Sequence, residues 1–292
     1  MRPRPPIRLR AIALAALLAL PVGSALADHR RETVTLTLDN GRRIAAELRL
    51  PNDSGDTPVP AVMLFGGLQS ADRTLDLLPD VDAPMAMASF DYPYDPPRSF
   101  TFPGSIRHLP AARAAIFDTL EGIGALFDAL VAHPAIDGER ITVVGASLGA
   151  PFAVVTAARH DIPGMVAVQG YGNLDTVIAH QLALRFEPRF GRAGRLLADA
   201  LSWFITAYAR LPSPEEHARQ LGPDQRALLV TARDDRIIPE RATNALWTAM
   251  TDSRATAARR DLEGGHLHSS ADAMIRRILG ETLAWLHDEG LL

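Results

Sequence analysis

The chain of 292 residues contains no cysteine and no lysine. Without cysteine it can form no disulfide bond and has no thiol for lipid attachment, and such a composition suits an oxidising compartment. All 30 basic residues are therefore arginine, which we attribute to genome composition. Hydrophobic residues make up 47% of the chain and charged residues 22%, as in an ordinary globular protein with a sizeable core.

Long hydrophobic runs are also scarce. The apolar run at residues 11–20 is shorter than the roughly 20 residues of a membrane-spanning helix. Four arginines precede it, and the small-residue pattern Ala25-Leu26-Ala27 follows it. This order predicts a secretory signal peptide over residues 1–27, cleaved before Asp28, with an uncleaved anchor as the alternative. The mature chain, residues 28–292, is then expected in the periplasm or the medium, without a stable membrane span.

The charge balance argues against nucleic acid as a partner. Removal of residues 1–27 takes away four arginines and no acidic residue, which leaves 26 Arg against 34 Asp and Glu and a net charge of −8. Binding to phosphates needs a basic face, which this composition does not favour. We find no internal repeat in the sequence.

Apolar strands alternate with amphipathic helices along most of the chain. Strands are expected at residues 33–38, 44–50, 61–65, 85–92, 141–144, 164–169 and 227–232, with a last strand ending near 262. Helices are expected at residues 110–133, 151–159, 241–250 and 271–287. This alternation predicts an α/β fold with a mainly parallel central sheet and helices on both faces. Asn40-Gly41 predicts an N-terminal antiparallel hairpin of edge strands, with positive φ at both turn residues.

Residues 172–222 interrupt this alternation. They are predicted to be helical at 182–186 and 193–208, and apolar residues gather on one stripe of the second helix: Leu196, Leu197, Leu201, Phe204, Ile205 and Tyr208. We interpret the segment as a helical cap over the carboxyl edge of the sheet, where open α/β sheets bind ligands. A structural insertion packed on the core is the alternative.

The most informative motif is Gly145-Ala146-Ser147-Leu148-Gly149, between the strand at 141–144 and the helix at 151–159. A strand that reverses into a helix around one serine forces that serine into a strained backbone and exposes its hydroxyl. Small neighbours are needed because strand and helix approach closely at the turn. Ser147 is therefore a candidate nucleophile.

Two further polar residues follow predicted strands in the order that a serine nucleophile needs. Asp235 comes after the strand at 227–232, and His266 comes after the last strand. A serine hydroxyl needs a base within hydrogen-bond reach, and the base needs an acid to fix its tautomer. Asp234 or Asp175 could take the place of the acid, and His268 that of the base. We assign no role to the remaining candidate histidines: His108, His133, His160 and His180.

The sequence has no cluster of His, Asp and Glu at metal-ligand spacing and no phosphate-binding glycine loop. We expect neither a metal nor another cofactor.

These motifs resemble those of the α/β-hydrolase family, and the resemblance extends over residues 33–287. It rests on the turn around Ser147, the Asp235-x-x-Ile238-Pro239 segment and Gly264-Gly265-His266. The resemblance implies that Ser147 is the nucleophile, Asp235 orients the base, and His266 is the general base and then the acid. It also implies an oxyanion hole formed by the amide of Leu148 and by that of Gly67 or Leu68. The family often has His-Gly where this chain has Phe65-Gly66, so the second donor stays open between Gly67 and Leu68.

The Phe-Gly-Gly-Leu loop at 65–68 and the His-Pro-Ala-Ile-Asp segment at 133–137 resemble dienelactone hydrolases and acyl thioesterases. Dienelactone hydrolases usually carry a Cys nucleophile, which Ser147 is not. The resemblance implies a serine esterase acting on a small-molecule ester or acyl substrate. A thioesterase, a peptidase and a non-catalytic binding protein on the same fold are the alternatives; export counts against coenzyme A thioesters, which are scarce outside the cytoplasm.

Overall fold

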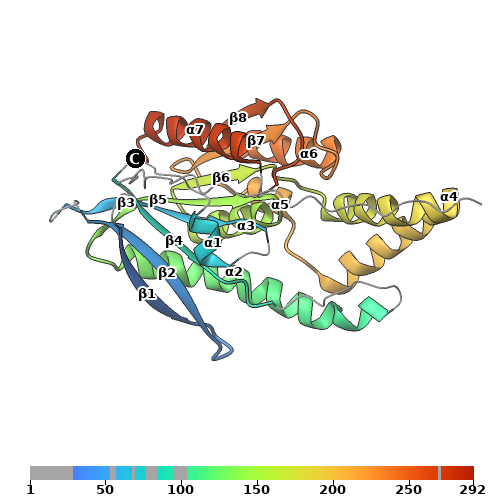
Figure 1. Ribbon diagram of the computed structural model, residues 1–292, viewed down its shortest axis with the longest axis horizontal. Coiled ribbons are helices and arrows are strands. Elements are labelled where there is room, and N and C mark those ends of the chain that lie inside the picture. Colours follow the sequence, from blue (N-terminus) through green and yellow to red (C-terminus); the bar gives the residue numbers. More distant parts are fainter. Residues whose placement is uncertain (1–28, 53–56, 68–69, 77–83, 95–103, 269–270) are drawn as a thin grey trace, which may run out of the picture.

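Eight strands of the described chain form one sheet in the order β1-β2-β4-β3-β5-β6-β7-β8 (Figure 1). The computed structural model describes residues 29–292 except 53–56, 68–69, 77–83, 95–103 and 269–270. The strands are β1 (His29–Thr37), β2 (Arg43–Pro51), β3 (Val59–Phe65), β4 (Ala86–Phe90), β5 (Ile136–Ala146), β6 (Gly164–Val168), β7 (Arg226–Ala232) and β8 (Thr256–Leu262). β1–β2 and β2–β4 are antiparallel pairs, and all other neighbours are parallel. The predicted mainly parallel sheet with an N-terminal antiparallel pair is confirmed.

The N-terminal hairpin differs from the prediction in two details. Of its two turn residues, Gly41 has positive φ, at +78°, and Asn40 does not. Asn40 instead uses its side chain, which accepts from the amide of Arg42 and donates to Asp118. Of the two hairpin strands, β1 lies at an edge of the sheet and β2 does not, because β2 also pairs with β4. A polar–apolar alternation predicts one buried face but cannot show whether the strand has a second neighbour.

Helices cover both faces of the sheet, as predicted (Figure 1). α2 (Leu109–Val131), α3 (Ala150–His160) and α6 (Glu240–Thr251) pack on one face, and α1 (Ala71–Asp76) and α7 (Asp272–Asp288) lie on the other. Alternate residues of the central strands supply the two cores: Ile141 and Val143 of β5 face α2 and α3, and Val144 faces α7. Neither α1 nor the short turn η1 (Gly104–His108) was predicted from the sequence.

The insertion after β6 is more continuously helical than predicted. α4 (Leu174–Ala209) consists of two helices that meet at Gly191. The backbone of Gly191 is not helical, because its φ is 55° and its ψ is −137°. Figure 1 shows this helical hairpin projecting beyond the sheet, and the short α5 (Pro214–Ala218) follows it. Much of the predicted apolar stripe is exposed: Leu196 is 70% exposed, Phe204 44% and Tyr208 46%. The base of α4 contacts the loop after β7, where Gln181 donates to the carbonyl of Ile237.

None of the helices within the described ranges combines the length and the hydropathy required to cross a membrane.

Candidate active site

Ser147 occupies a sharp turn between β5 and α3. Its φ is +52°, a left-handed conformation that costs a non-glycine residue of order 1–3 kcal/mol. The flanking glycines are required by space, because a Cβ on Gly145 would collide with the carbonyl of Gly149, and a Cβ on Gly149 with that of Phe65. Pro151 lies in the first turn of α3, where its missing amide N–H breaks no helical hydrogen bond. The strand, turn and helix that the sequence predicts around Ser147 are therefore present.

Three residues from distant parts of the chain meet at this turn. Ser147 Oγ lies 2.8 Å from His266 Nε2, and His266 Nδ1 lies 2.8 Å from Asp235 Oδ2. The side chains of His266 and Asp235 are 16% and 9% exposed, so the pair is largely withdrawn from water. The structure thus brings together Ser147, Asp235 and His266 in one hydrogen-bonded chain.

The loop after β7 fixes both oxygens of Asp235. Its Oδ1 accepts from the amides of Ile237 and Ile238, at 2.8 and 3.0 Å, while Oδ2 faces His266. Burial by itself raises the pKa of Asp235, but the hydrogen bonds from His266 and these two amides outweigh it and hold the pKa below its usual value. Asp235 is therefore a carboxylate that stays charged and keeps one orientation.

The alternative residues lie elsewhere. The side chain of Asp234 is exposed, and its amide donates to the carbonyl of Gly264. Asp175 is an exposed residue in the first turn of α4. His268 is exposed, two residues beyond the position in contact with Ser147.

The predicted oxyanion donors are only partly described. Gly67 lies in the wall of the same cavity as Ser147. Leu148 follows Ser147 in the short turn η2 (Ser147–Gly149). Leu68 lies outside the described residues. The loop after β3 is tied to the segment that follows β4, because the hydroxyl of Tyr92 donates to the carbonyl of Gly66 at 2.8 Å, and burial raises the pKa of that hydroxyl.

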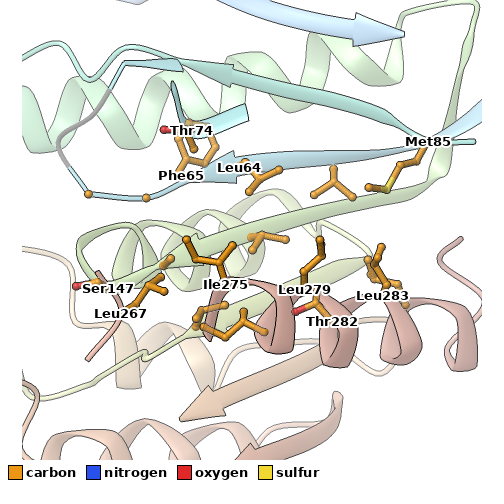
Figure 2. Close-up of a pocket in the computed structure, with 18 residues that line it drawn as sticks. Leu64, Phe65, Thr74, Met85, Ser147, Leu267, Ile275, Leu279, Thr282 and Leu283 are labelled. Atoms are coloured by element: carbon orange, nitrogen blue, oxygen red, sulfur yellow. The ribbon is translucent and has the colours of Figure 1, made fainter. Parts of the chain in front are cut away.

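An apolar cavity of about 220 Å³ opens beside Ser147, between the sheet and α7 (Figure 2). Its described lining contains no charged side chain and no residue of α4. The lining residues are Val62, Leu64, Phe65, Gly66, Gly67, Thr74, Met85, Val144, Ala146, Ser147, Val168, Leu267, Ile275, Ile278, Leu279, Thr282, Leu283 and Leu286. Among the described residues, no group of three or more His, Cys, Asp or Glu could hold a metal ion.

Sequence reasoning missed Gln169, which directly follows β6. It is 3% exposed and has a φ of +49°. Its Nε2 donates to the carbonyl of Gly265 at 3.1 Å, and its Oε1 accepts from the amide of Leu267 at 2.6 Å. These two bonds hold the backbone on either side of His266. The available signal was a polar residue at the carboxyl end of a buried strand, where ligand-facing side chains gather.

Replacement of Gln169 by Leu is expected to lower kcat/KM for an ester about tenfold to a hundredfold. Each lost hydrogen bond is worth about 0.5–1.5 kcal/mol, and about 1.4 kcal/mol corresponds to a tenfold change in rate. Because Gln169 positions His266 rather than touching substrate, the loss should fall on kcat more than on KM. Steady-state kinetics of the purified variant measures both constants.

Gln225 supplies a matched control. It is also 3% exposed, and its Nε2 donates to the carbonyls of Ala157 and Ile162 near the amino end of β7, away from Ser147. Gln225→Leu should lower the melting temperature and leave kcat of the folded enzyme unchanged. Equal losses of kcat in the two variants would show that Gln169 acts only through stability.

The structure is similar to solved structures of hydrolases. Acetyl xylan esterase 1 from Thermoanaerobacterium is 16% identical, with a TM-score of 0.56, over 89% of this chain and 84% of that one. A candidate dienelactone hydrolase from Klebsiella pneumoniae is 15% identical, with a TM-score of 0.62, over 89% and 99%. A puromycin-hydrolyzing peptidase from Mycobacterium tuberculosis is 19% identical, with a TM-score of 0.63, over 92% of this chain and 41% of that one.

These likenesses show that the chain has the α/β-hydrolase fold. No protein-family model and no curated protein sequence matches the chain.

Proposed function

We propose that this protein is a serine hydrolase that cleaves a carboxylic ester through an acyl-enzyme intermediate. The observation that carries the proposal is the hydrogen-bonded chain from Ser147 to His266 to Asp235 at a strained strand–helix turn. This arrangement can activate a hydroxyl that is otherwise a weak nucleophile. The hydrolases of the same fold, among them an esterase, support the class of reaction.

In the first half of the proposed reaction, Ser147 Oγ attacks the ester carbonyl and its proton passes to His266 Nε2. The amide of Leu148 and that of Gly67 or Leu68 stabilise the resulting oxyanion. The carbon–oxygen bond to the alcohol then breaks, and the alcohol leaves with the proton from His266. Each oxyanion donor of this kind typically contributes about 10²- to 10³-fold in rate.

In the second half, His266 takes a proton from water, and the hydroxide attacks the acyl-enzyme carbonyl. Ser147 leaves as the alkoxide and recovers the proton from His266, so that the free acid is released and the enzyme is restored. Asp235 accepts from Nδ1 of His266 throughout, which keeps Nε2 free to exchange the proton and stabilises the imidazolium.

An ester substrate is favoured by the cavity beside Ser147, whose described lining carries no charged group for a peptide terminus or a nucleotide. From the leader pattern of residues 1–27 alone, we also propose that the mature chain acts in the periplasm or the medium. Recovery of a processed chain solely from the cytoplasmic fraction would contradict that location.

The proposed function is tested with one acyl group presented as an ester, an anilide and a thioester. We expect the p-nitrophenyl ester to be hydrolysed fastest, with a pre-steady-state burst of about one nitrophenolate per chain, because acylation traps one acyl group on Ser147. Faster cleavage of the anilide would indicate a peptidase. Failure to turn over all three compounds would indicate a binding protein on a hydrolase fold.

A further inference from the structure

We infer that the cavity between the sheet and α7 takes up the acyl chain, and that the substrates are esters of unbranched acids of about six to ten carbons. The inference rests on the proposed function of Ser147. It places the acyl chain inside the hydrolase core, rather than under the projecting helices of α4.

The position of the cavity links it to the reacting atoms. In Figure 2, Ser147 and Leu267 lie at one end and Leu283 and Met85 at the other, so the cavity leads from the nucleophile into the layer between sheet and helix. An acyl group attached to Ser147 Oγ would therefore start at the mouth of the cavity. Side chains of β3, β5 and β6 form one wall: Val62, Leu64, Val144, Ala146 and Val168.

The opposite wall is a stripe on α7 whose aliphatic side chains are only partly covered by the core cluster of the sheet. Ile275, Leu279 and Leu283 recur at intervals of four, so they lie on one face of the helix, and all three line the cavity. They remain only half-buried. Protein interiors are close-packed, with few voids larger than a water molecule. A row of accessible aliphatic side chains inside the sheet–helix layer is thus a binding surface for an apolar ligand.

Thr282 adds one hydroxyl to this otherwise aliphatic wall of α7. It lines the same cavity and is 7% exposed, yet its hydroxyl has no hydrogen-bond partner among the described residues. Threonines in the middle of a helix commonly bond to the carbonyl four residues earlier, as Thr119 does to Ala115 in α2. Thr142 and Trp285, which do not line the cavity, also carry a buried polar atom without a partner among the described residues, so the acyl site is inferred from the aliphatic lining and its position beside Ser147.

The dimensions of the cavity set the chain length. Its lining on α7 runs from Ile275 to Leu286, which at 1.5 Å per residue is about 16 Å. An extended chain advances about 1.2 Å per bond, so this length accepts at most about a dozen carbons. The volume of about 220 Å³ is several times the about 30 Å³ that one water molecule or methylene group occupies, so the cavity accepts a chain of several carbons. Along the about 16 Å of lining on α7, the cavity is wide enough for one alkyl chain.

The experiment measures kcat/KM of the wild-type protein for p-nitrophenyl esters from acetyl to hexadecanoyl. Each buried methylene should raise kcat/KM about fourfold. We expect a maximum between hexanoyl and decanoyl and a fall beyond dodecanoyl. Leu279→Trp fills the middle of the cavity and should move the maximum to shorter chains, lowering the octanoyl-to-acetyl ratio by about 100-fold, as three or four unburied methylenes imply.

Two further variants keep this test decisive. Leu283 lies farther from Ser147 than Leu279 does, so Leu283→Trp should shorten the preferred acyl chain less than Leu279→Trp. With two variants, the cavity is still tested if one of them folds poorly. Leu196→Trp makes the same change on the exposed face of α4 and should leave the chain-length profile as in the wild type.

The outcomes separate the two proposals. No turnover of any ester would contradict the proposed function. Two results would overturn the cavity as the acyl site and leave the proposed function intact. One is turnover that depends on Ser147 while kcat/KM stays flat or falls from the acetyl ester onward. The other is a chain-length profile that Leu196→Trp shifts and Leu279→Trp does not.

Discussion

Replacement of Ser147 by Ala is expected to lower kcat/KM for a p-nitrophenyl ester by at least about 10⁴-fold. The activity that remains is the rate enhancement from substrate binding and the oxyanion donors without a nucleophile. Without Oγ, no acyl-enzyme can form, and His266 Nε2 loses the group that lies 2.8 Å away. The fold should persist, because Ala is no larger than Ser and Ser147 is only half-buried. Stopped-flow kinetics should show that the burst of nitrophenolate is also gone.

Ser202 provides the matched control for this substitution. It is 2% exposed, and its hydroxyl donates to the carbonyl of Asp175, within α4. Ser202→Ala should retain the burst and the wild-type kcat/KM. Full activity in Ser147→Ala, with its melting temperature close to that of the wild type, would remove Ser147 from the mechanism.

Replacement of Asp235 by Asn should lower kcat by about 10⁴-fold, the effect expected when the base is held in the wrong tautomer. The amides of Ile237 and Ile238 both donate to Oδ1, so the amide oxygen of Asn will take that position and its NH₂ group will face His266. Nδ1 then becomes an acceptor and Nε2 carries the proton, which leaves nothing to accept the proton of Ser147. Measurement of kcat at saturating ester, with circular dichroism as a check of the fold, tests this.

The neighbouring Asp234 makes this prediction specific. Its side chain is exposed, and only its backbone amide bonds to the loop that carries His266. Asp234→Asn should therefore keep kcat near the wild-type value. The opposite result, with Asp234→Asn inactive and Asp235→Asn active, would assign the acid to Asp234.

The features that could be predicted from the sequence are those encoded by neighbouring residues. The turn around Ser147 needs small residues at 145 and 149, and these are visible in the sequence as a motif. Asp235 and His266 follow apolar strands, and the carboxyl ends of parallel strands lie at one edge of the sheet. Local chemistry and simple topology therefore sufficed to propose which residues meet.

The features that could not be predicted depend on distances between elements far apart in the chain. Gln169 bonds to Gly265 and Leu267, almost a hundred residues later, and one glutamine carries no spacing signal. The cavity lies between α7 and the sheet beside Leu279 and its neighbours, and periodicity along one helix does not reveal a space between two elements. The stripe on α4 had the pattern of a buried face, yet the hairpin at Gly191 carries much of it into the open.

The central claim is that Ser147 is the nucleophile, and covalent labelling with a fluorophosphonate tests it most directly. Intact-protein mass spectrometry should show one adduct per chain, and peptide mapping should place it on Ser147. Ser147→Ala should take up no label, and Asp235→Asn should be labelled far more slowly. An adduct on another residue, or an unlabelled Ser147 in a protein that still hydrolyses esters, would contradict the account.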